Sequence, residues 1–231
     1  MVLTRWLALS ASLWLLGLPI SAACQTPPSA QQAQQYTGLH AAAWTGDLPQ
    51  LQRLIEACAD LNLRDANGRT PLHAATFARR HEVLRRLAAA GADLGALEND
   101  RYDAVTIAAV ADDEETLRLL LALGASAKLV TSRYDGTALI AAAHLGHDGV
   151  VRQLIAAGAP LDHVNNLHWT ALIESIVLGN GGPRHVATLQ ALVAAGADTQ
   201  LADRQGHTPL ALARERGYAP MVQILLKAGA K

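Results

Sequence analysis

Residues 69–80 read RTPLHAATFARR, and the same phrase returns along the whole chain with changed details. The six copies are YTGLHAAAWTGD (36–47), RTPLHAATFARR (69–80), YDAVTIAAVADD (102–113), GTALIAAAHLGH (136–147), WTALIESIVLGN (169–180) and HTPLALARERGY (207–218). Counted from the second residue of each copy, the spacings are 33, 33, 34, 33 and 38 residues. A fixed period of this length predicts a stack of similar units, each burying its apolar face against its neighbours.

Each unit has the signals of two short helices. In the second copy, Thr70 can cap a helix whose first turn holds Pro71, where the missing N–H costs nothing. A second helix is expected over 82–90, and Gly91 can end it in a left-handed conformation. Hydrophobic residues make up 51% of the chain but aromatic residues only 4%, so packing relies on alanine and leucine. This composition suits closely spaced helices.

The phrases TPLH (70–73), GH (146–147) and the recurrent AAGAD resemble the ankyrin repeat family, and the resemblance covers about 195 of the 231 residues. It implies an all-α solenoid of six helix-turn-helix units with short finger loops. The repeat domain is expected over 36–231, with units at about 36–68, 69–101, 102–135, 136–168, 169–206 and 207–231. It also implies that His40, His73 and His147 make structural hydrogen bonds between units.

The N-terminus has a different character. Arg5 is followed by an apolar run over 6–20 and by small residues up to Ala23, which is the outline of a secretory signal peptide over 1–23. The run is short for a membrane span. Ordinary cleavage after Ala23, acylation of Cys24 as in a lipoprotein, and a retained anchor all stay open, although Ser21 stands where a lipoprotein signal prefers an aliphatic residue. Residues 24–35 are polar and proline-containing, so we expect a flexible leader that can turn helical near its end.

Two units depart from the period. The fifth unit carries five extra residues around 179–185, where two adjacent glycines and Pro183 predict a loop rather than a longer helix. That loop is interpreted either as a ligand or partner contact or as a tolerated surface insertion. In the third unit, acidic residues over 112–115 are expected to stabilise the N-terminus of the second helix.

Several classes of function receive no support from the sequence. The formal charge is −1 and the basic residues are scattered, so nucleic-acid binding is not expected. His144 and His147 have no second cluster of ligands beside them, and a zinc site needs three or four. No nucleophile-elbow, zinc-protease or phosphate-loop motif occurs, so we expect no catalytic residue, no cofactor and no metal.

Equivalent positions of the repeats predict where a partner would bind. The residue seven places after each aligned start forms one row on the first helices, which in the family faces the concave groove: Trp44, Phe77, Val110, His144, Val177 and Glu215. A second row lies at the base of the fingers and contains Arg69, Tyr102 and Trp169, with Arg101, Tyr134 and His168 nearby. These types anchor interfaces. The predicted partner-binding set is Trp44, Phe77, Val110, His144, Glu174, Val177, Arg69, Arg101, Tyr102, Tyr134, His168 and Trp169. The aromatic members can alternatively pack between units.

Cys58 stands where five later units carry glycine, as in Gly91. Its backbone is therefore expected to be left-handed, at a cost of about 1 to 2 kcal/mol. Cys24 is its only possible partner within the chain, so Cys24 and Cys58 are candidates for a disulfide, and a free or intermolecularly paired thiol is the alternative.

Together these patterns predict a non-catalytic protein-binding module or scaffold, monomeric and exported to the bacterial periplasm or secreted, with a protein partner in its groove and on its fingers. The alternatives are a lipoprotein anchored through Cys24, an immunity or inhibitor protein that blocks an envelope-acting toxin or enzyme, and an enzyme that uses the 179–185 insertion. Membrane contact is expected only through a retained signal or an acylated Cys24.

Overall fold

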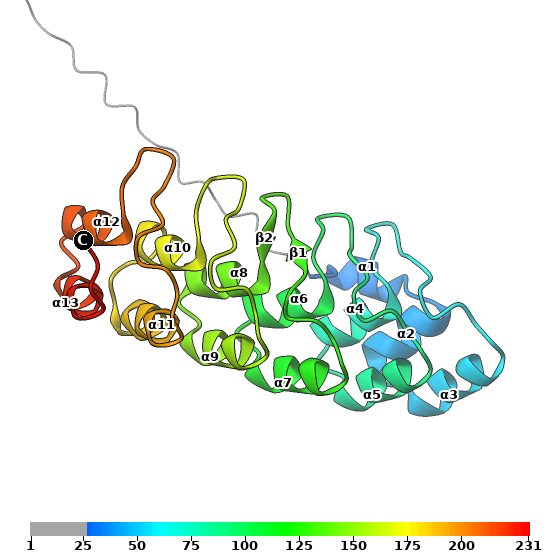
Figure 1. Ribbon diagram of the computed structural model, residues 1–231. Coiled ribbons are helices and arrows are strands. Elements are labelled where there is room, and N and C mark those ends of the chain that lie inside the picture. The colour runs from blue at the N-terminus through cyan, green and yellow to red at the C-terminus, as the bar shows by residue number, and fades with distance from the viewer. Residues whose placement is uncertain (1–26) are drawn as a thin grey trace, which may run out of the picture.

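Six consecutive pairs of antiparallel helices form the protein, as the repeat predicted (Figure 1). The computed structural model describes residues 27–231. The elements are α1 (Ala30–Gln34), α2 (Gly38–Thr45), α3 (Leu48–Glu56), α4 (Pro71–Phe77), α5 (His81–Ala89), α6 (Ala104–Val110), α7 (Glu114–Ala122), β1 (Val130–Thr131), β2 (Gly136–Thr137), α8 (Ala138–Leu145), α9 (Asp148–Ala156), α10 (Ala171–Val177), α11 (Pro183–Ala194), α12 (Pro209–Glu215) and α13 (Ala219–Lys227). The all-α solenoid is thereby confirmed, with one two-stranded hairpin as its only sheet in the described part of the chain.

The first and second helices of the units form two layers (Figure 1). A first helix that lies between two others is buried on nearly all sides; in α4, every residue from Pro71 to Thr76 is buried. Second helices bury one face only: in α5 this face holds Val83, Leu84 and Leu87. The spacing of three to four residues keeps apolar side chains on the inner face and leaves charge outside.

The helix caps follow the predicted signals. The Thr70 side chain accepts a hydrogen bond from the backbone N–H of His73, and Pro71 occupies the first turn of α4. Asp113 caps α7 in the same way, with Glu114 and Glu115 in the first turn, so the acidic run does stabilise a helix start. The repeat's local chemistry therefore determines where helices begin.

Finger loops project from the array between units and contact one another (Figure 1). The backbone N–H groups of Asn99 and Asn166 donate to the carbonyl oxygens of Asn67 and Tyr134, each on the preceding finger. The finger before α8 contains the β1–β2 hairpin, in which Val130 pairs with Thr137. These contacts hold the finger bases at fixed positions beside the first helices.

The end of the leader is helical. Ser29 forms a capping box with Gln32 at the start of α1. The Gln32 side-chain amide donates to the Asn67 side-chain oxygen at 3.0 Å, which attaches α1 to the first finger. Signal peptide 1–23 and the leader residues before Pro27 lie outside the described residues. Among residues 27–231, every helix is too short or too polar to cross a membrane.

The insertion in the fifth unit differs from the prediction of a loop without a longer helix. α11 has 12 residues, whereas the second helix α9 of the preceding unit has 9, so part of the insertion adds a turn of helix. Gly182 is its N-cap and Pro183 its first residue. Proline is favoured there because its fixed φ suits the first turn, and this is why the expected loop is shorter than predicted.

Candidate functional site

A hollow of about 90 Å³ lies between the first helices α6, α8 and α10 and the fingers beside them. A space of this size has room for several water molecules or one side chain. Six members of the predicted partner-binding set line it: Val110, His144, Glu174, Tyr102, Tyr134 and Trp169. Residues from two predicted rows and three repeats thus meet in one place, which we call the central pocket.

The other predicted members lie outside the central pocket. Trp44 stacks edge-on against Tyr36 with ring centroids 6.2 Å apart, and Val177 packs against the core. Phe77 lines a second hollow, of about 220 Å³, together with Pro27. Arg101 and His168 are exposed at finger tips. These residues therefore remain predictions without a common site.

Arg69 requires a correction, because its side chain is only 4% exposed. Its guanidinium lies 5.9 Å from the centre of the Phe77 ring and 3.6 Å from the Asp65 carboxylate. The side chain therefore links Asp65 of the first unit to Phe77 of the second, and Arg69 is no exposed anchor in this structure.

The central pocket exists because two histidines are missing. In the first two units, His40 and His73 fill the space under the next finger, with Nε2 2.8 Å from the carbonyl oxygen of Arg69 and 3.2 Å from that of Tyr102. The inter-unit hydrogen bonds implied for these histidines are thereby present. The equivalent residues of the third and fourth units are Thr106 and Ile140, which both line the pocket. The shorter Thr106 side chain contacts the next finger through its hydroxyl oxygen, which lies 3.2 Å from that of Thr131.

Glu174 is the buried charge-bearing group of the central pocket. Its side chain is 7% exposed. The Asn165 side-chain amide donates to its Oε1 at 2.8 Å. Burial raises the pKa of Glu174 to about 7, and the hydrogen bond from Asn165 opposes only part of this shift. The carboxyl group therefore changes charge near neutral pH.

His144 faces Glu174 from α8, with 3.6 Å between its Nδ1 and Glu174 Oε2. Burial lowers the pKa of His144, and the neighbouring His185 and His147 lower it further. Burial disfavours the charged forms of both groups. Near neutral pH the imidazole of His144 is therefore neutral, while the carboxyl group of Glu174 is partly ionised. Glu174 consequently has no strong counter-ion in His144.

Asn165 connects the Glu174 carboxyl group to the finger that carries Trp169. Its Oδ1 accepts hydrogen bonds from the backbone N–H groups of Leu167 and Trp169, both at 3.0 Å, while its amide donates to Glu174. The Glu174 carboxyl group and the backbone of this finger are thus joined through a single side chain. Asn165 was not among the predicted site residues; the signal for it is its position, since Asp65 and Asp203 stand at the same place in their fingers.

The fingers around the central pocket have strained tips. Arg101, Asp135 and His168 have positive φ angles of 66°, 52° and 63°, where the first and last complete fingers have Gly68 and Gly206. A non-glycine residue in this region costs of the order of 1 kcal/mol. Strain retained at three neighbouring fingers is typical of a functional surface.

The insertion of the fifth unit braces the third and fourth units. Arg184 lies 2.8 Å from Asp112 and 3.3 Å from Asp148, and these three residues come from three repeats. His185 lies 2.9 Å from the carbonyl oxygen of His144 through Nε2, and 3.1 Å from Asn180 Oδ1 through Nδ1. The insertion thus supports the backbone behind the central pocket.

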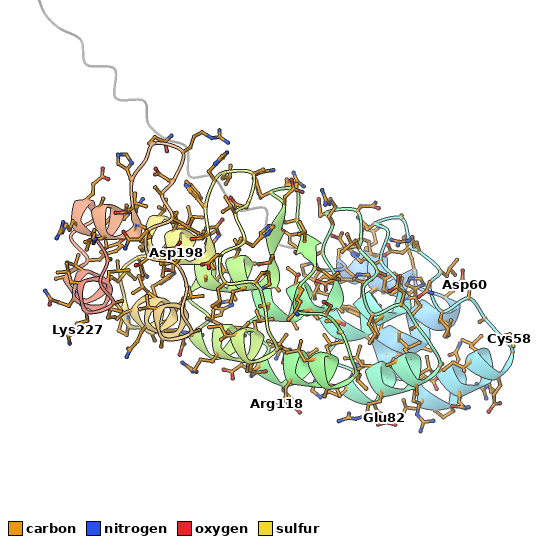
Figure 2. All side chains as sticks on the ribbon, in the orientation of Figure 1. Cys58, Asp60, Glu82, Arg118, Asp198 and Lys227 are labelled. Atoms are coloured by element: carbon orange, nitrogen blue, oxygen red, sulfur yellow. The ribbon has the colours of Figure 1, made fainter. Side chains whose placement is uncertain are left out.

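Cys58 has the expected left-handed backbone, with φ of 57°, and its side chain is exposed. Figure 2 shows it at the outer end of the first unit, far along the array from α8 and α10. Cys24 lies outside the described residues, so the candidate disulfide stays a prediction. In the part of the chain from Pro27 onward, no cluster of three histidine, cysteine or acidic side chains is arranged to hold a metal ion.

Stacked helix pairs and finger loops that contact their neighbours define a repeat solenoid. The chain belongs to the ankyrin repeat family: a family model of three consecutive ankyrin repeats matches it over 20–97, 39–131, 105–203 and 139–231. Ankyrin repeats are protein–protein interaction modules.

Individual relatives agree with this assignment. An ankyrin repeat domain from Acinetobacter baumannii AYE, known from a crystal structure, is 43% identical, with a TM-score of 0.78 and coverage of 84% of this chain and 98% of that domain. The ankyrin repeat protein YahD of Escherichia coli K12 is 41% identical over 100 residues, or 43% of this chain. An ankyrin repeat-containing protein of Treponema pallidum is 37% identical over 107 residues, or 46% of this chain. The chain spans 50% of the length of YahD and 34% of the length of the Treponema protein.

Proposed function

We propose that this protein is a non-catalytic binding module of the bacterial periplasm, which holds a segment of a protein partner across the central pocket. The observation that carries the proposal is the convergence of Tyr102, Tyr134, Trp169, His144, Val110 and Glu174 around one hollow. Aromatic side chains beside a pocket are the usual anchors of protein interfaces.

The periplasmic part of the proposal is supported by the signal-like pattern over 1–23. Fractionation of expressing cells, with mass determination of the mature N-terminus, tests it. Cleavage after Ala23 and recovery with periplasmic proteins are expected. Recovery in the membrane fraction with an acylated Cys24 would show that the protein is a lipoprotein. An uncleaved chain in the cytoplasm would contradict export.

The absence of catalysis is proposed because the insertion is used structurally. Both ring nitrogens of His185 lie at hydrogen-bond distance from groups of the protein itself, and Arg184 is paired with two aspartates. An enzyme that used this segment would need such groups to face a substrate.

Partner capture with two matched double variants tests the binding site. Wild-type protein, Tyr134→Ala with Trp169→Ala, and Trp44→Ala with Phe77→Ala each serve as bait for periplasmic extract, and captured proteins are identified and then titrated in purified form. The first double variant should lose the partner by a factor of about 100 in affinity, since two interface aromatics together contribute about 3 kcal/mol. The second should keep it, because Trp44 and Phe77 lie outside the central pocket.

Thermal unfolding by circular dichroism accompanies each bait, so that loss of fold is separated from loss of binding. Equal binding by wild type and the first double variant would contradict the site. Once the partner is purified, its own activity in the complex separates a scaffold, which preserves that activity, from an inhibitor or immunity protein, which abolishes it.

A further inference from the structure

We propose that the central pocket receives a lysine or arginine side chain of the partner, with the Glu174 carboxylate as its counter-charge and Tyr134 and Trp169 beside it. This inference rests on the proposed function and specifies the chemistry of the partner segment. It follows from where Glu174 stands in the repeat, what surrounds it, and which charges nearby are already used.

Glu174 occupies a core position of the repeat. The equivalent residues of the other five units are Ala41, Ala74, Ile107, Ala141 and Leu212. Only this unit places a carboxyl group there, and the group is buried. A carboxyl group in such surroundings lowers stability unless it is paired. A residue that costs stability at a position where alanine would fit is most simply explained by a ligand that uses its charge.

The described chain does not supply the missing positive charge. Among residues 27–231, the only basic side chain within ion-pair distance of Glu174 is His144, which is neutral near pH 7. The arginines of the adjacent fingers are already paired: Arg101 lies 3.1 Å from Asp135, and Arg133 lies 2.6 Å from Asp100. A cation from outside would therefore meet a carboxylate without a competitor.

The walls of the pocket match the rest of a long basic side chain. Val110, Ile140 and Leu145 offer apolar surface for its methylene groups. Tyr134 and Trp169 line the same hollow, and aromatic rings attract a cation placed over them. An acidic side chain would be repelled by Glu174. A purely apolar one would leave the carboxyl group buried without a charge partner.

Three small probes that differ only in the end group of the side chain test the proposal: the Nα-acetyl methylamides of lysine, arginine and norleucine. Dissociation constants are measured by NMR titration of the wild-type protein at pH 8, with the Glu carboxyl carbons labelled. The lysine or arginine probe should bind at least about tenfold more tightly than norleucine and lower the pKa of Glu174. Norleucine binding equally or more tightly, or no probe binding at millimolar concentration, would overturn the proposal.

Two variants localise the effect. Glu174→Gln keeps the shape of the side chain and removes its charge, so it should abolish the preference over norleucine. Glu82→Gln removes the same charge from the second-helix layer, where Figure 2 shows Glu82 pointing away from the array, and should retain the preference. A preference that survives in Glu174→Gln would show that another group binds the cation, against the proposal.

The pH dependence gives a second readout. The titratable groups that face Glu174 are His144 on α8 and the phenols of Tyr102 and Tyr134, with His147 and His185 acting on His144. Since the carboxylate fraction falls from about nine-tenths at pH 8 to about one-tenth at pH 6, binding of the cationic probes should weaken about tenfold. Any protonation of His144 acts in the same direction. Unchanged binding over this range would contradict a role for the carboxylate.

Failure of this inference is distinguishable from failure of the proposed function. If Tyr134→Ala with Trp169→Ala loses the partner but the probes show no preference for a cation, the pocket binds a protein and the assigned chemistry is wrong. If capture is insensitive to the aromatic residues, the proposed site itself is wrong, whatever the probes do.

Discussion

The two halves of the concave groove differ in what fills them. Under the first two fingers, the buried rings of His40 and His73 occupy the space, and Phe77 lines a separate hollow together with Pro27 of the leader. Under the fingers of the third to fifth units, Thr106 and Ile140 replace the histidines and a hollow remains, with a buried carboxyl group at its wall. The same repeat positions thus contribute to cohesion in one half and line the proposed recognition site in the other; the two are called the cohesion half and the recognition half.

The largest expected effect concerns cohesion in the first half. His73→Ala should lower the free energy of unfolding by about 3 to 4 kcal/mol, because the ring is fully buried and lies between Thr70 and the carbonyl oxygen of Tyr102 in the next unit. Urea unfolding at pH 7 measures it. His207→Ala, at an exposed residue of the last finger, is the control and should stay within about 0.5 kcal/mol.

Acid conditions sharpen this prediction. Burial lowers the pKa of His73 to about 4 from its ordinary 6.5, so the stability that the neutral ring contributes is present above pH 6.5 and is lost as the pH falls toward 4. The difference between wild type and His73→Ala should therefore shrink over this window. A constant difference, or one no larger than that of His207→Ala, would mean that the histidines do not hold the first half together.

The second prediction concerns the cost of the recognition half. Because burial raises the pKa of Glu174 from 4.5 to about 7, the folded state loses stability relative to the unfolded state as the pH rises through this window. Glu174→Gln should be more stable than wild type at pH 8 by about 2 kcal/mol, since burial of the new amide offsets part of the gain. At pH 4 the two should be nearly equal.

Unfolding in urea at both pH values, with Glu82→Gln beside it, measures this difference. The control should show no such dependence because Glu82 is exposed and its pair with Arg86 is a surface pair. A Glu174→Gln variant that is less stable than wild type at pH 8 would show that the carboxylate stabilises the fold, and its position in the core would then need a structural reason.

The third prediction concerns a variant in which the recognition half is given the buried histidine of the first two units. Ile140 stands three residues after the N-cap Thr137, as His73 stands three residues after Thr70. Ile140→His should therefore place a histidine ring under the finger that ends at Trp169. The hollow is then filled, and partner affinity should fall about tenfold with little change in stability. Ile140→Val is the matched control that leaves the hollow open. Titration of the purified partner measures the affinity of both variants. Equal affinities would show that the hollow is not needed for binding.

The sequence predicted the architecture because each unit repeats the same cap and helix-end chemistry, from Thr70 to Gly91. It predicted part of the lining of the central pocket because the repeat period places Val110 and His144 in one row regardless of fine packing. The hollow itself depends on two histidines that are missing, which appears only when Thr106 is compared with His73. Arg69 is buried because its side chain lies beside Asp65 and Phe77, and no local sequence pattern reports those contacts.

The insertion shows a similar limit. The two glycines and Pro183 were correct signals for a turn, but Pro183 also begins a helix of 12 residues whose first turn contacts distant repeats. Arg184 reaches Asp112, which is 72 residues away in the chain. A brace of this kind is determined by three-dimensional neighbours, so spacing alone could not distinguish it from an exposed loop.

The prediction with the smallest expected change concerns backbone strain at Cys58, which lies outside both halves of the groove. Cys58 adopts a φ of 57° where equivalent helix ends have glycine, such as Gly91 at 90°. Cys58→Gly should therefore raise the free energy of unfolding by about 1 kcal/mol without changing partner affinity. Cys58→Ser keeps the strained backbone and removes the thiol, so it should leave stability unchanged. If both variants instead lower the free energy of unfolding by the same amount, the thiol itself stabilises the fold, as expected of a disulfide with Cys24. The backbone strain would then be the smaller of the two effects.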